Sequence, residues 1–300
     1  MISLKQIRYF VATAEAQKVS AAAIELGISQ SAVTVAIKEL EAYLGIPLIS
    51  RRVGGIRLTQ DGLKFLNHAK NIEANIADAI HTMKNKEAET TGRFRLGVTY
   101  TGVGYFLLPI LARFRRSYPE VDIELIEMSR VQLERALRKK EVDLALIIVS
   151  NLSDRRSFKH KIVMKSPRLL WLSSQHRLNS LHEITLQDLE FEPYVQFISD
   201  EADASARKYL AETGFKPKTI LRTTSMEAVR GMVATGAAVT ILAGLVYRPW
   251  SLDGARVELR PLGDSVPTLD LGIAWKRERR LSDAEIKFLS YFESDALPVR

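Results

Sequence analysis

Apolar residues recur at helical spacing through the first sixty positions of the chain. One set predicts a helix from about Leu4 to Ala16, and its members are Leu4, Ile7, Phe10, Val11 and Ala14. Ser20 then stands where an N-cap belongs, before a short apolar helix over residues 21–26 that Gly27 ends. Ser29 is placed to cap a third helix. Two helices joined by a tight turn with a glycine, packed on a first helix, predict a helix-turn-helix.

The third helix is expected to bury one face and to leave a small, polar face outside. The apolar face consists of Val33, Ile37, Leu40 and Leu44. The residues expected to point outward or to lie on the flank are Gln30, Ser31, Thr34, Val35, Lys38, Glu39 and Ala42. Such a face can enter the major groove of DNA, where Gln30, Ser31 and Thr34 reach base edges and Lys38 meets phosphate. We add Ser20 to this predicted DNA-binding set.

The segment IPLISRRVGGIRLTQDG after Gly45 predicts a two-stranded wing around a Gly54-Gly55 turn. It carries three arginines and no acidic residue before Asp61, and these arginines are Arg51, Arg52 and Arg57. Residues 1–60 hold seven Lys or Arg against four Glu, a net charge of +3, and three of the seven positive residues lie in the wing. The alternative interpretation is a small helical subdomain with a solvated basic hairpin.

A single long helix is predicted from Asp61 to about Thr90. Its apolar residues recur at steps of three, four or six, and are Leu63, Leu66, Ile72, Ile76, Ile80 and Met83. Because no core lies nearby in the sequence, a partner helix is the expected cover, which predicts a dimer. Packing on the chain's own C-terminal part is the alternative. The polar stretch KNKEAETTG then ends the helix at Gly92 and serves as a hinge.

Beyond Gly92 strands and helices alternate. RFRLGVT, VDIELIEM and VDLALIIVS read as strands separated by helices, and this βαβαβ order predicts a parallel sheet with right-handed crossovers. A second unit of the same kind is expected from about Arg168, with strands RLLWLS, PYVQFI, KTILRTTS and AVTILAG and a short helix in ITLQDLEF.

Loops at the carboxyl ends of parallel strands are where open α/β sheets bind ligands. The candidates here are polar or glycine-containing segments, and are Thr99-Tyr100-Thr101-Gly102, Ser150-Asn151 and Thr223-Thr224-Ser225. Gln196 and Phe197 would face the same cleft if the two units close on each other. Hydroxyl, amide and backbone N–H groups suit a carboxylate or another small anion. Each polar residue could instead serve as a helix cap.

The composition argues against several classes of chemistry. The 300 residues include no cysteine, which removes disulfides, thiolate catalysis and iron–sulfur clusters, and the five histidines show no metal-ligand spacing. Neither GxGxxG, GxxxxGK[ST] nor GxSxG occurs, so we predict no cofactor, no metal site and no catalytic residue. The net charge of +8 mildly favours a polyanionic partner. The apolar runs are too short to span a bilayer and no signal peptide follows Met1, so a cytoplasmic protein is expected.

Taken together, the chain resembles the LysR-type transcriptional regulators over essentially its whole length. The resemblance is strongest in LKQIRYFVATAE, VSAAAIELGISQSAVTVAIKELEAYLGIPLISR and RLTQDG, which look like the family's winged helix-turn-helix. RFRLGVTYTGVGYFLLPILARFRRSYPEVDIEL, KEVDLALI and HRLNSLHEITLQDLE are similar to the family's two-lobed, periplasmic-binding-protein-like effector domain. The resemblance implies Thr101, Gln196 and Thr224 as the first effector contacts, with Thr99 and Ser150 next.

The chain departs from the family pattern at four positions. Ser31 stands where proline is frequent, and Val35 stands where a basic or polar residue is common, so base preference is expected to rest on Gln30, Ser31, Thr34 and a methyl contact from Val35. In ATGAAVTILAG, Ala238 and Ala243 replace the usual glycine and proline near the cleft wall.

We therefore expect a multidomain α and α/β protein. Its predicted parts are a winged helix-turn-helix over 1–60, a linker helix over 61–91 and a two-lobed effector domain over 92–300, with lobe I at about 92–163 and 268–300 and lobe II at about 164–267. The predicted function is regulation of transcription by a homo-oligomer, a dimer by its linker helix and a tetramer by resemblance. Its predicted partners are a partly dyad DNA operator and a small, anionic effector between the lobes, with no membrane. The predicted effector contacts are Thr99, Thr101, Gly102, Ser150, Gln196, Phe197 and Thr224. The alternative is a small-molecule-binding or enzymatic α/β protein whose N-terminal helices serve only assembly.

Overall fold

The computed structural model describes residues 1–52, 55–84, 90–199, 201–263 and 266–292. Within these ranges, the side chains of residues 51–52, 57, 60, 67, 74, 77–78 and 81–84 are not described. The chain divides into two compact units, Met1–Ala88 with Ser290–Arg300 and Glu89–Leu289. Each unit is described by itself.

The first unit begins with the three predicted helices, α1 (Leu4–Ala16), α2 (Val19–Leu26) and α3 (Gln30–Leu44). Their apolar faces meet in one core around Phe10, Val33 and Leu40, each completely buried. This arrangement confirms the helical periodicity read from the sequence, including the bounds of α1.

The turns between these helices confirm two predicted signals and correct a third. Ser29 caps α3 by accepting from the Ala32 N–H at 3.2 Å, and Gly27 ends α2 in the left-handed region at φ 65°. Ser20 is not an N-cap, because α2 already starts at Val19 and Lys18 holds the cap position without a side-chain bond. The shift follows from Gln17, whose left-handed φ of 51° ends α1 and brings the chain into the next helix two residues early.

The wing forms as predicted, from antiparallel strands β1 (Ile49–Arg52) and β2 (Gly55–Leu58). Gly54, half of the predicted turn, lies outside the described residues. The Glu41 carboxylate on α3 accepts from the Leu48 and Ile49 N–H groups at 2.7 and 2.9 Å, which fixes the start of the wing to the third helix. Sequence analysis had given Glu41 no role.

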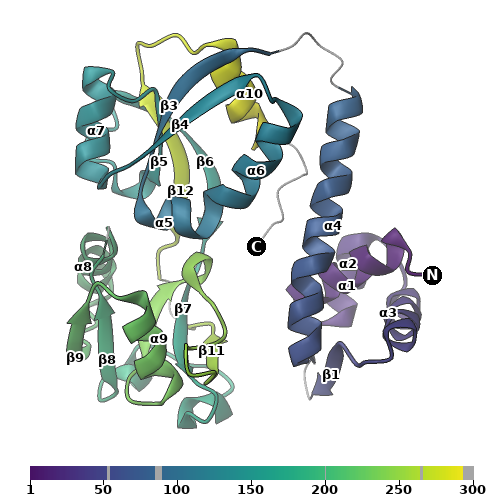
Figure 1. The fold of residues 1–300 in the computed structure, drawn as a ribbon. Coiled ribbons are helices and arrows are strands. Elements are labelled where there is room, and N and C mark those ends of the chain that lie inside the picture. Colours follow the sequence, from purple (N-terminus) through teal and green to yellow (C-terminus); the bar gives the residue numbers. More distant parts are fainter. Residues whose placement is uncertain (53–54, 85–89, 200, 264–265, 293–300) are drawn as a thin grey trace. The chain divides into compact units, whose positions relative to one another are not determined.

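The long helix α4 runs from Gln60 to Lys84 and is visible as one continuous helix in Figure 1. Its first turns pack against α1, with the Phe10 and Phe65 rings 5.3 Å apart and Lys70 bonded to Glu15 at 2.5 Å. A Cβ on Gly62 would lie 1.9 Å from the Leu48 carbonyl oxygen, so glycine permits this close approach.

The second unit contains a five-stranded sheet in the order β4-β3-β5-β12-β6. Three strands are parallel, as predicted, and are β3 (Gly92–Val98), β4 (Val121–Glu127) and β5 (Leu144–Ile148). The other two, β12 (Leu269–Lys276) and β6 (Phe158–Ser166), join antiparallel. The sheet is therefore mixed: β3, β4 and β5 are parallel, and β12 and β6 extend the sheet beyond β5 with antiparallel pairing.

Helices cover both faces of this sheet (Figure 1). On one face α7 (Arg130–Lys139) buries Leu133 and Leu137 against the strands. On the other face α6 (Leu108–Ser117) and α10 (Asp283–Tyr291) meet through Phe114 and Phe288, whose rings are 5.1 Å apart. Between β3 and α6 the chain is helical throughout, as α5 (Tyr100–Gly102) and a π-turn (Val103–Leu107), where the sequence suggested a loop.

The remaining strands confirm the predicted second βαβ unit in part and correct the rest of it. β7 (Arg168–Ser173) pairs antiparallel with both β10 (Thr240–Ala243) and β11 (Val257–Arg260), and only β8 (Pro193–Phe197) and β9 (Lys218–Thr223) pair in parallel. The helices here are α8 (Ala202–Thr213) and α9 (Met226–Ala234). The expected helix in ITLQDLEF shortens to a 3₁₀ turn at Gln187–Leu189. Similar 3₁₀ turns occupy Val149–Asn151, Arg177–Ser180 and Gly244–Val246.

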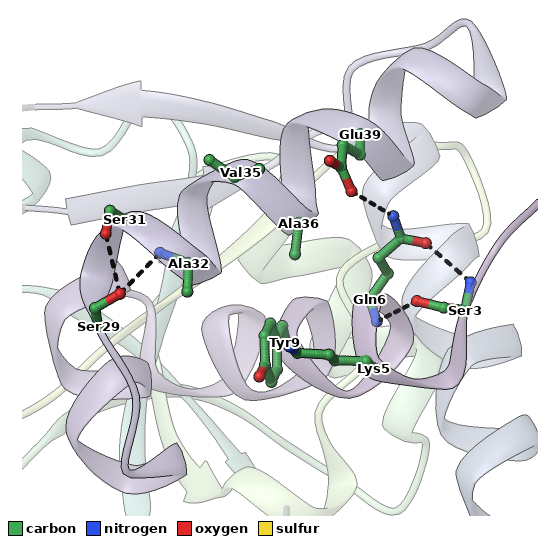
Figure 2. A pocket seen from close by; sticks show the side chains of 10 residues that line it. All are labelled: Ser3, Lys5, Gln6, Tyr9, Ser29, Ser31, Ala32, Val35, Ala36 and Glu39. Atoms are coloured by element: carbon green, nitrogen blue, oxygen red, sulfur yellow. Dashed lines mark hydrogen bonds between the residues drawn. The ribbon is translucent and has the colours of Figure 1, made fainter.

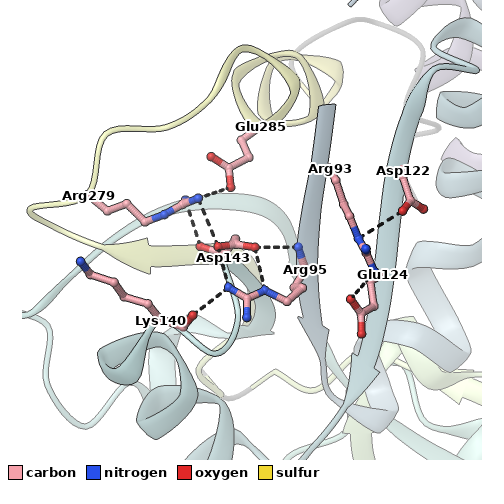
Figure 3. A network of polar contacts seen from close by, with 8 residues as sticks. All are labelled: Arg93, Arg95, Asp122, Glu124, Lys140, Asp143, Arg279 and Glu285. Atoms are coloured by element: carbon pink, nitrogen blue, oxygen red, sulfur yellow. Dashed lines mark hydrogen bonds and ion pairs between the residues drawn. The ribbon is translucent and has the colours of Figure 1, made fainter. Parts of the chain in front are cut away.

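A charged network joins two inner strands of the five-stranded sheet to α10 (Figure 3). Asp143 accepts from the Arg95 backbone N–H at 2.8 Å and from its side chain at 3.1 Å, and it also pairs with Arg279 at 3.2 Å. Arg279 continues to Glu285 at 2.6 Å, at the start of α10. The network therefore ties β3, the start of β5 and the last helix together.

Candidate DNA-binding surface and interlobe residues

The outward face of α3 carries the predicted base-reading residues. Gln30, Ser31 and Lys38 are exposed, Thr34 is half-buried, and Val35 is 53% exposed despite its apolar side chain. An exposed valine on the outer face of a recognition helix can make an apolar contact with the methyl group of a thymine. The structure thus presents these side chains on one surface of the first unit.

Two hydroxyls on this face, those of Ser31 and Thr34, are already oriented by hydrogen bonds. The Ser31 and Ser29 oxygens lie 3.0 Å apart (Figure 2). The Thr34 hydroxyl donates to the Gln30 carbonyl at 2.9 Å. Its proton is used within the helix while its lone pairs remain, so Thr34 is suited to accept from a base amino group.

A groove of about 400 Å³ runs between α1 and α3 beside this face (Figure 2). It is lined by Ser3, Lys5, Gln6, Tyr9, Ser29, Ser31, Ala32, Val35, Ala36 and Glu39. Gln6 is held at both ends of its amide, since its oxygen accepts from the Ser3 N–H at 2.9 Å and its nitrogen donates to Glu39 at 3.0 Å. The Lys5 ammonium lies 5.6 Å from the centre of the Tyr9 ring.

The residues that α1 contributes to this groove were not predicted from the sequence. One signal was available, because Ser3 and Gln6 have the spacing of a capping box and form one. The contact from Gln6 to Glu39 spans 33 positions, so nothing in the local pattern announced it.

The wing arginines are placed only by their backbone. Arg51 pairs with Ile56 and Arg57 with Ser50 across the hairpin, and Arg52 faces Gly55. The side chains of all three arginines lie outside the described residues. Their assignment to phosphate stays a prediction.

The predicted dimerisation stripe on α4 is divided in two. Leu66 packs against the core of the first unit, so its own helix-turn-helix already covers it. Farther along, Ile72 is 36% and Ile80 50% exposed, with Ile76 half-buried between them, while Leu63 at the other end is half-buried. The Met83 side chain lies outside the described residues.

In lobe I the predicted effector residues lie after β3 and β5. Thr99 is completely buried and caps α5 by accepting from the Gly102 N–H at 3.4 Å. Thr101 is 5% exposed, and Ser150 is half-buried. A Cβ on Gly102 would lie 3.1 Å from the Leu146 side chain. The capping role considered for these residues is real at Thr99.

In lobe II the structure separates Gln196 from Phe197. Successive side chains of β8 point to opposite faces, and Phe197 packs in a core cluster with Trp171 and Val229. Phe197 is 3% exposed in this cluster, against which Tyr105 of lobe I also packs, and its contact with an effector stays a prediction. Gln196 is buried on the other face, and Thr224 is exposed just before α9.

Among the described residues, two sets of contacts between the lobes were not predicted from the sequence. In one, Arg230 on α9 donates to the Tyr105 hydroxyl at 3.2 Å, and the Arg248 guanidinium lies 5.2 Å from the Tyr105 ring centre. Burial, together with a hydrogen bond to Tyr105, raises the pKa of the neighbouring Tyr100 to about 12. Tyr100 therefore stays neutral at physiological pH.

The second set centres on Glu201, just before α8. Its carboxylate accepts from the Asn151 amide nitrogen at 2.7 Å and pairs with the Arg130 Nε at 3.3 Å. Glu201 belongs to lobe II, and both partners belong to lobe I. Because these partners lie 50 or more positions from Glu201 in the sequence, no local motif predicts the contacts.

None of the helices described is by itself long and apolar enough to cross a membrane, although the bent pair Val19–Leu26 and Gln30–Leu44 meets the length and composition test jointly. Among the described side chains, no group of three or more His, Asp or Glu is placed to hold a metal ion.

Comparison with known proteins assigns both parts of the chain. Residues 4–63 match the family described as bacterial regulatory helix-turn-helix protein, lysR family, and residues 87–296 match the LysR substrate binding domain. The chain is 28% identical over 256 residues to the HTH-type transcriptional regulator AlsR of Bacillus subtilis, covering 84% of each protein. It is 27% identical over 288 residues to the regulator XapR of Escherichia coli, covering 96% of each.

A solved structure agrees over the whole length. The crystal structure of HinK, a LysR family transcriptional regulator from Pseudomonas aeruginosa, is 25% identical, has a TM-score of 0.63 and shares 99% coverage of both chains. With both domains of the family present and regulators as its relatives, this chain belongs to the LysR family of DNA-binding transcriptional regulators, whose C-terminal domain takes a small-molecule effector.

Proposed function

We propose that α3 reads an operator in the major groove while the wing and α2 hold the flanking backbone. In this arrangement Gln30, Ser31 and Thr34 contact base edges and Val35 contacts a thymine methyl group. The phosphate contacts come from Lys38, Ser20 and the three wing arginines, Arg51, Arg52 and Arg57. The observation that carries the proposal is the exposed face of α3, on which Val35 is open to solvent and Thr34 keeps only acceptor capacity.

We also propose that the effector is a small anion bound between the lobes, contacted by Thr99, Thr101, Gly102, Ser150, Gln196 and Thr224. The burial of Thr101 and Gln196 and the exposure of Thr224 at the start of α9 support this set. The regulator would act in the cytoplasm without catalysis, as a homodimer joined through α4 that pairs into a tetramer. The effector must bind two arrangements of the protein with different affinity, since otherwise it shifts nothing.

One pair of variants separates base reading from phosphate binding. We expect Thr34→Ala to weaken binding to the operator by about 1 kcal/mol, roughly fivefold, and to leave an unrelated duplex unaffected. Arg52→Ala should weaken both duplexes alike and lower the slope of log affinity against log salt by about one. Fluorescence anisotropy with labelled duplexes measures both, and circular dichroism confirms that each variant is folded.

The opposite pattern contradicts the proposal. If Thr34→Ala weakens the two duplexes equally, Thr34 does not read bases. If Arg52→Ala leaves affinity and salt slope unchanged, the wing does not contact phosphate.

A further inference from the structure

Arg130 and Asn151 lie at the edge of the lobe I sheet where ligands of α/β proteins bind. Arg130 opens α7 after β4, and Asn151 ends the turn after β5, while the Thr99–Gly102 segment follows β3 between them. All three positions follow the carboxyl ends of parallel strands. A ligand at this edge would therefore meet Arg130 on one side and Asn151 on the other.

The guanidinium of Arg130 is held in place from within lobe I. Its Nη1 donates to the Glu134 carboxylate one turn along α7, and Glu134 is almost fully buried. Glu134 is also bonded by the Ser153 N–H at 3.2 Å and by the Ser153 hydroxyl. Because Glu134 has these partners of its own, it anchors one side of Arg130 and leaves the Nε side facing lobe II.

The group on that side is a carboxylate from the opposite lobe. Glu201 has 5% of its side chain exposed and lies 3.3 Å from Arg130 and 2.7 Å from the Asn151 amide nitrogen. It occupies the N-cap position of α8 but makes no side-chain capping bond there. A carboxylate at a helix start ordinarily accepts from that helix's own N–H groups, so here the two lobe I donors hold it instead.

We propose that Arg130 and Asn151 are the carboxylate-binding residues of the effector site, and that Glu201 occupies their place until a carboxylate of the effector replaces it. This inference rests on the proposed binding of an effector between the lobes, and it names the ligand's chemical class. The exchange replaces one carboxylate by another, so Arg130 stays paired. A neutral ligand would leave the buried Nε side of Arg130 without a carboxylate, although Glu134 still pairs with Nη1, so the site favours carboxylates.

The exchange also changes what joins the lobes. With Glu201 displaced, this bridge between lobe I and lobe II is replaced by the ligand, while the contact of Arg230 with Tyr105 is untouched. Effector binding would in this way alter the arrangement of the lobes by breaking the contacts of Glu201 with Arg130 and Asn151.

Chemical rescue of the full-length protein tests the proposal. Glu201→Ala leaves Arg130 facing an empty place, and we expect its thermal midpoint to fall by on the order of 10 °C. Sodium acetate should raise that midpoint by about 3 °C or more above sodium chloride of equal ionic strength. Acetamide, which has acetate's shape without its charge, should not raise it, and the double variant Glu201→Ala, Arg130→Met should not respond to acetate.

Asp203→Ala is the matched control. Asp203 lies in the first turn of the same helix and pairs with Arg207 and Arg222, all within lobe II. This variant should show no acetate response beyond that of the unaltered protein. If Glu201→Ala does not fold, Glu201→Gln keeps the side-chain volume without the charge, and acetate should stabilise it more than it stabilises the unaltered protein.

Three results overturn the proposal: no acetate effect in the folded Glu201 variant, an equal effect of acetamide, or an acetate effect that persists without Arg130. The DNA binding of the same variants separates this inference from the proposed function. If operator binding is retained while acetate has no effect, only the assignment of Arg130 and Asn151 fails. If operator binding is absent even in the unaltered protein, the proposed function fails, whatever acetate does.

Discussion

Asp143 shows how one half-buried carboxylate can link stability to pH. Desolvation by itself would raise its pKa, but hydrogen bonds from Arg95 and the charge of Arg279 outweigh that effect and lower the pKa below its usual value. A group whose pKa is lower in the folded state stabilises the protein above its unfolded pKa. That contribution is lost as the pH falls through the folded pKa, so it is complete at neutral pH and disappears in acid below about pH 4.

We therefore expect Asp143→Asn to destabilise the second unit by about 1–3 kcal/mol at pH 7 and to flatten the loss of stability below about pH 4. Urea unfolding followed by tryptophan fluorescence is selective for this unit, because all three tryptophans, Trp171, Trp250 and Trp275, lie in it. Asp122→Asn is the control, since Asp122 pairs with Arg93 on the same sheet but is 67% exposed (Figure 3). A variant as stable as the unaltered protein at pH 7 would contradict this account of the network.

Single residues were predictable where their role is local. Ser29 and Gly27 act within a few positions of themselves, and the structure confirms both. Ser20 failed because Lys18 and Gln17 moved the start of α2. Glu201 could not be foreseen, because its partners come from the other lobe.

At the scale of elements, periodic segments were predictable and short ones were not. The three N-terminal helices, the wing and α4 were expected from spacing and turn residues, and each is present. β6 and β11 were missed because their residues are largely half-buried or exposed, so neither reads as a continuous apolar run. Without β11, lobe II was interpreted as a second βαβ unit throughout. This holds for β8, α8 and β9, but not for β7 and β10, which pair antiparallel.

The C-terminal half of α4 carries the prediction that belongs to this scale. We expect Ile80→Glu to weaken self-association at least about tenfold, because a charge would replace an apolar side chain that is half exposed in the single chain. Sedimentation velocity across a concentration series measures this. Asn71→Glu, an exposed polar position on the same helix, is the control. If Ile80→Glu associates like the unaltered protein, α4 is not the dimerisation helix.

At the scale of the whole molecule, the chain joins a DNA-reading unit to an effector domain. The alternative of N-terminal helices used only for assembly does not fit, since residues 4–63 match the helix-turn-helix of a regulatory family and α3 leaves its reading face exposed. The fold class and the function could be predicted from the sequence, because the helix-turn-helix shows helical spacing of apolar residues and the effector domain shows alternating strands and helices. The effector's contacts did not, because they depend on side chains brought together from two lobes.

The measurement that tests the central claim most directly is binding of this protein to its own upstream intergenic DNA. Fluorescence anisotropy across a salt series, with unrelated duplex as competitor, distinguishes sequence reading from charge attraction. The account predicts tight binding that resists the competitor and weakens steeply with salt. Binding no tighter than to unrelated duplex would contradict the claim that α3 reads an operator there.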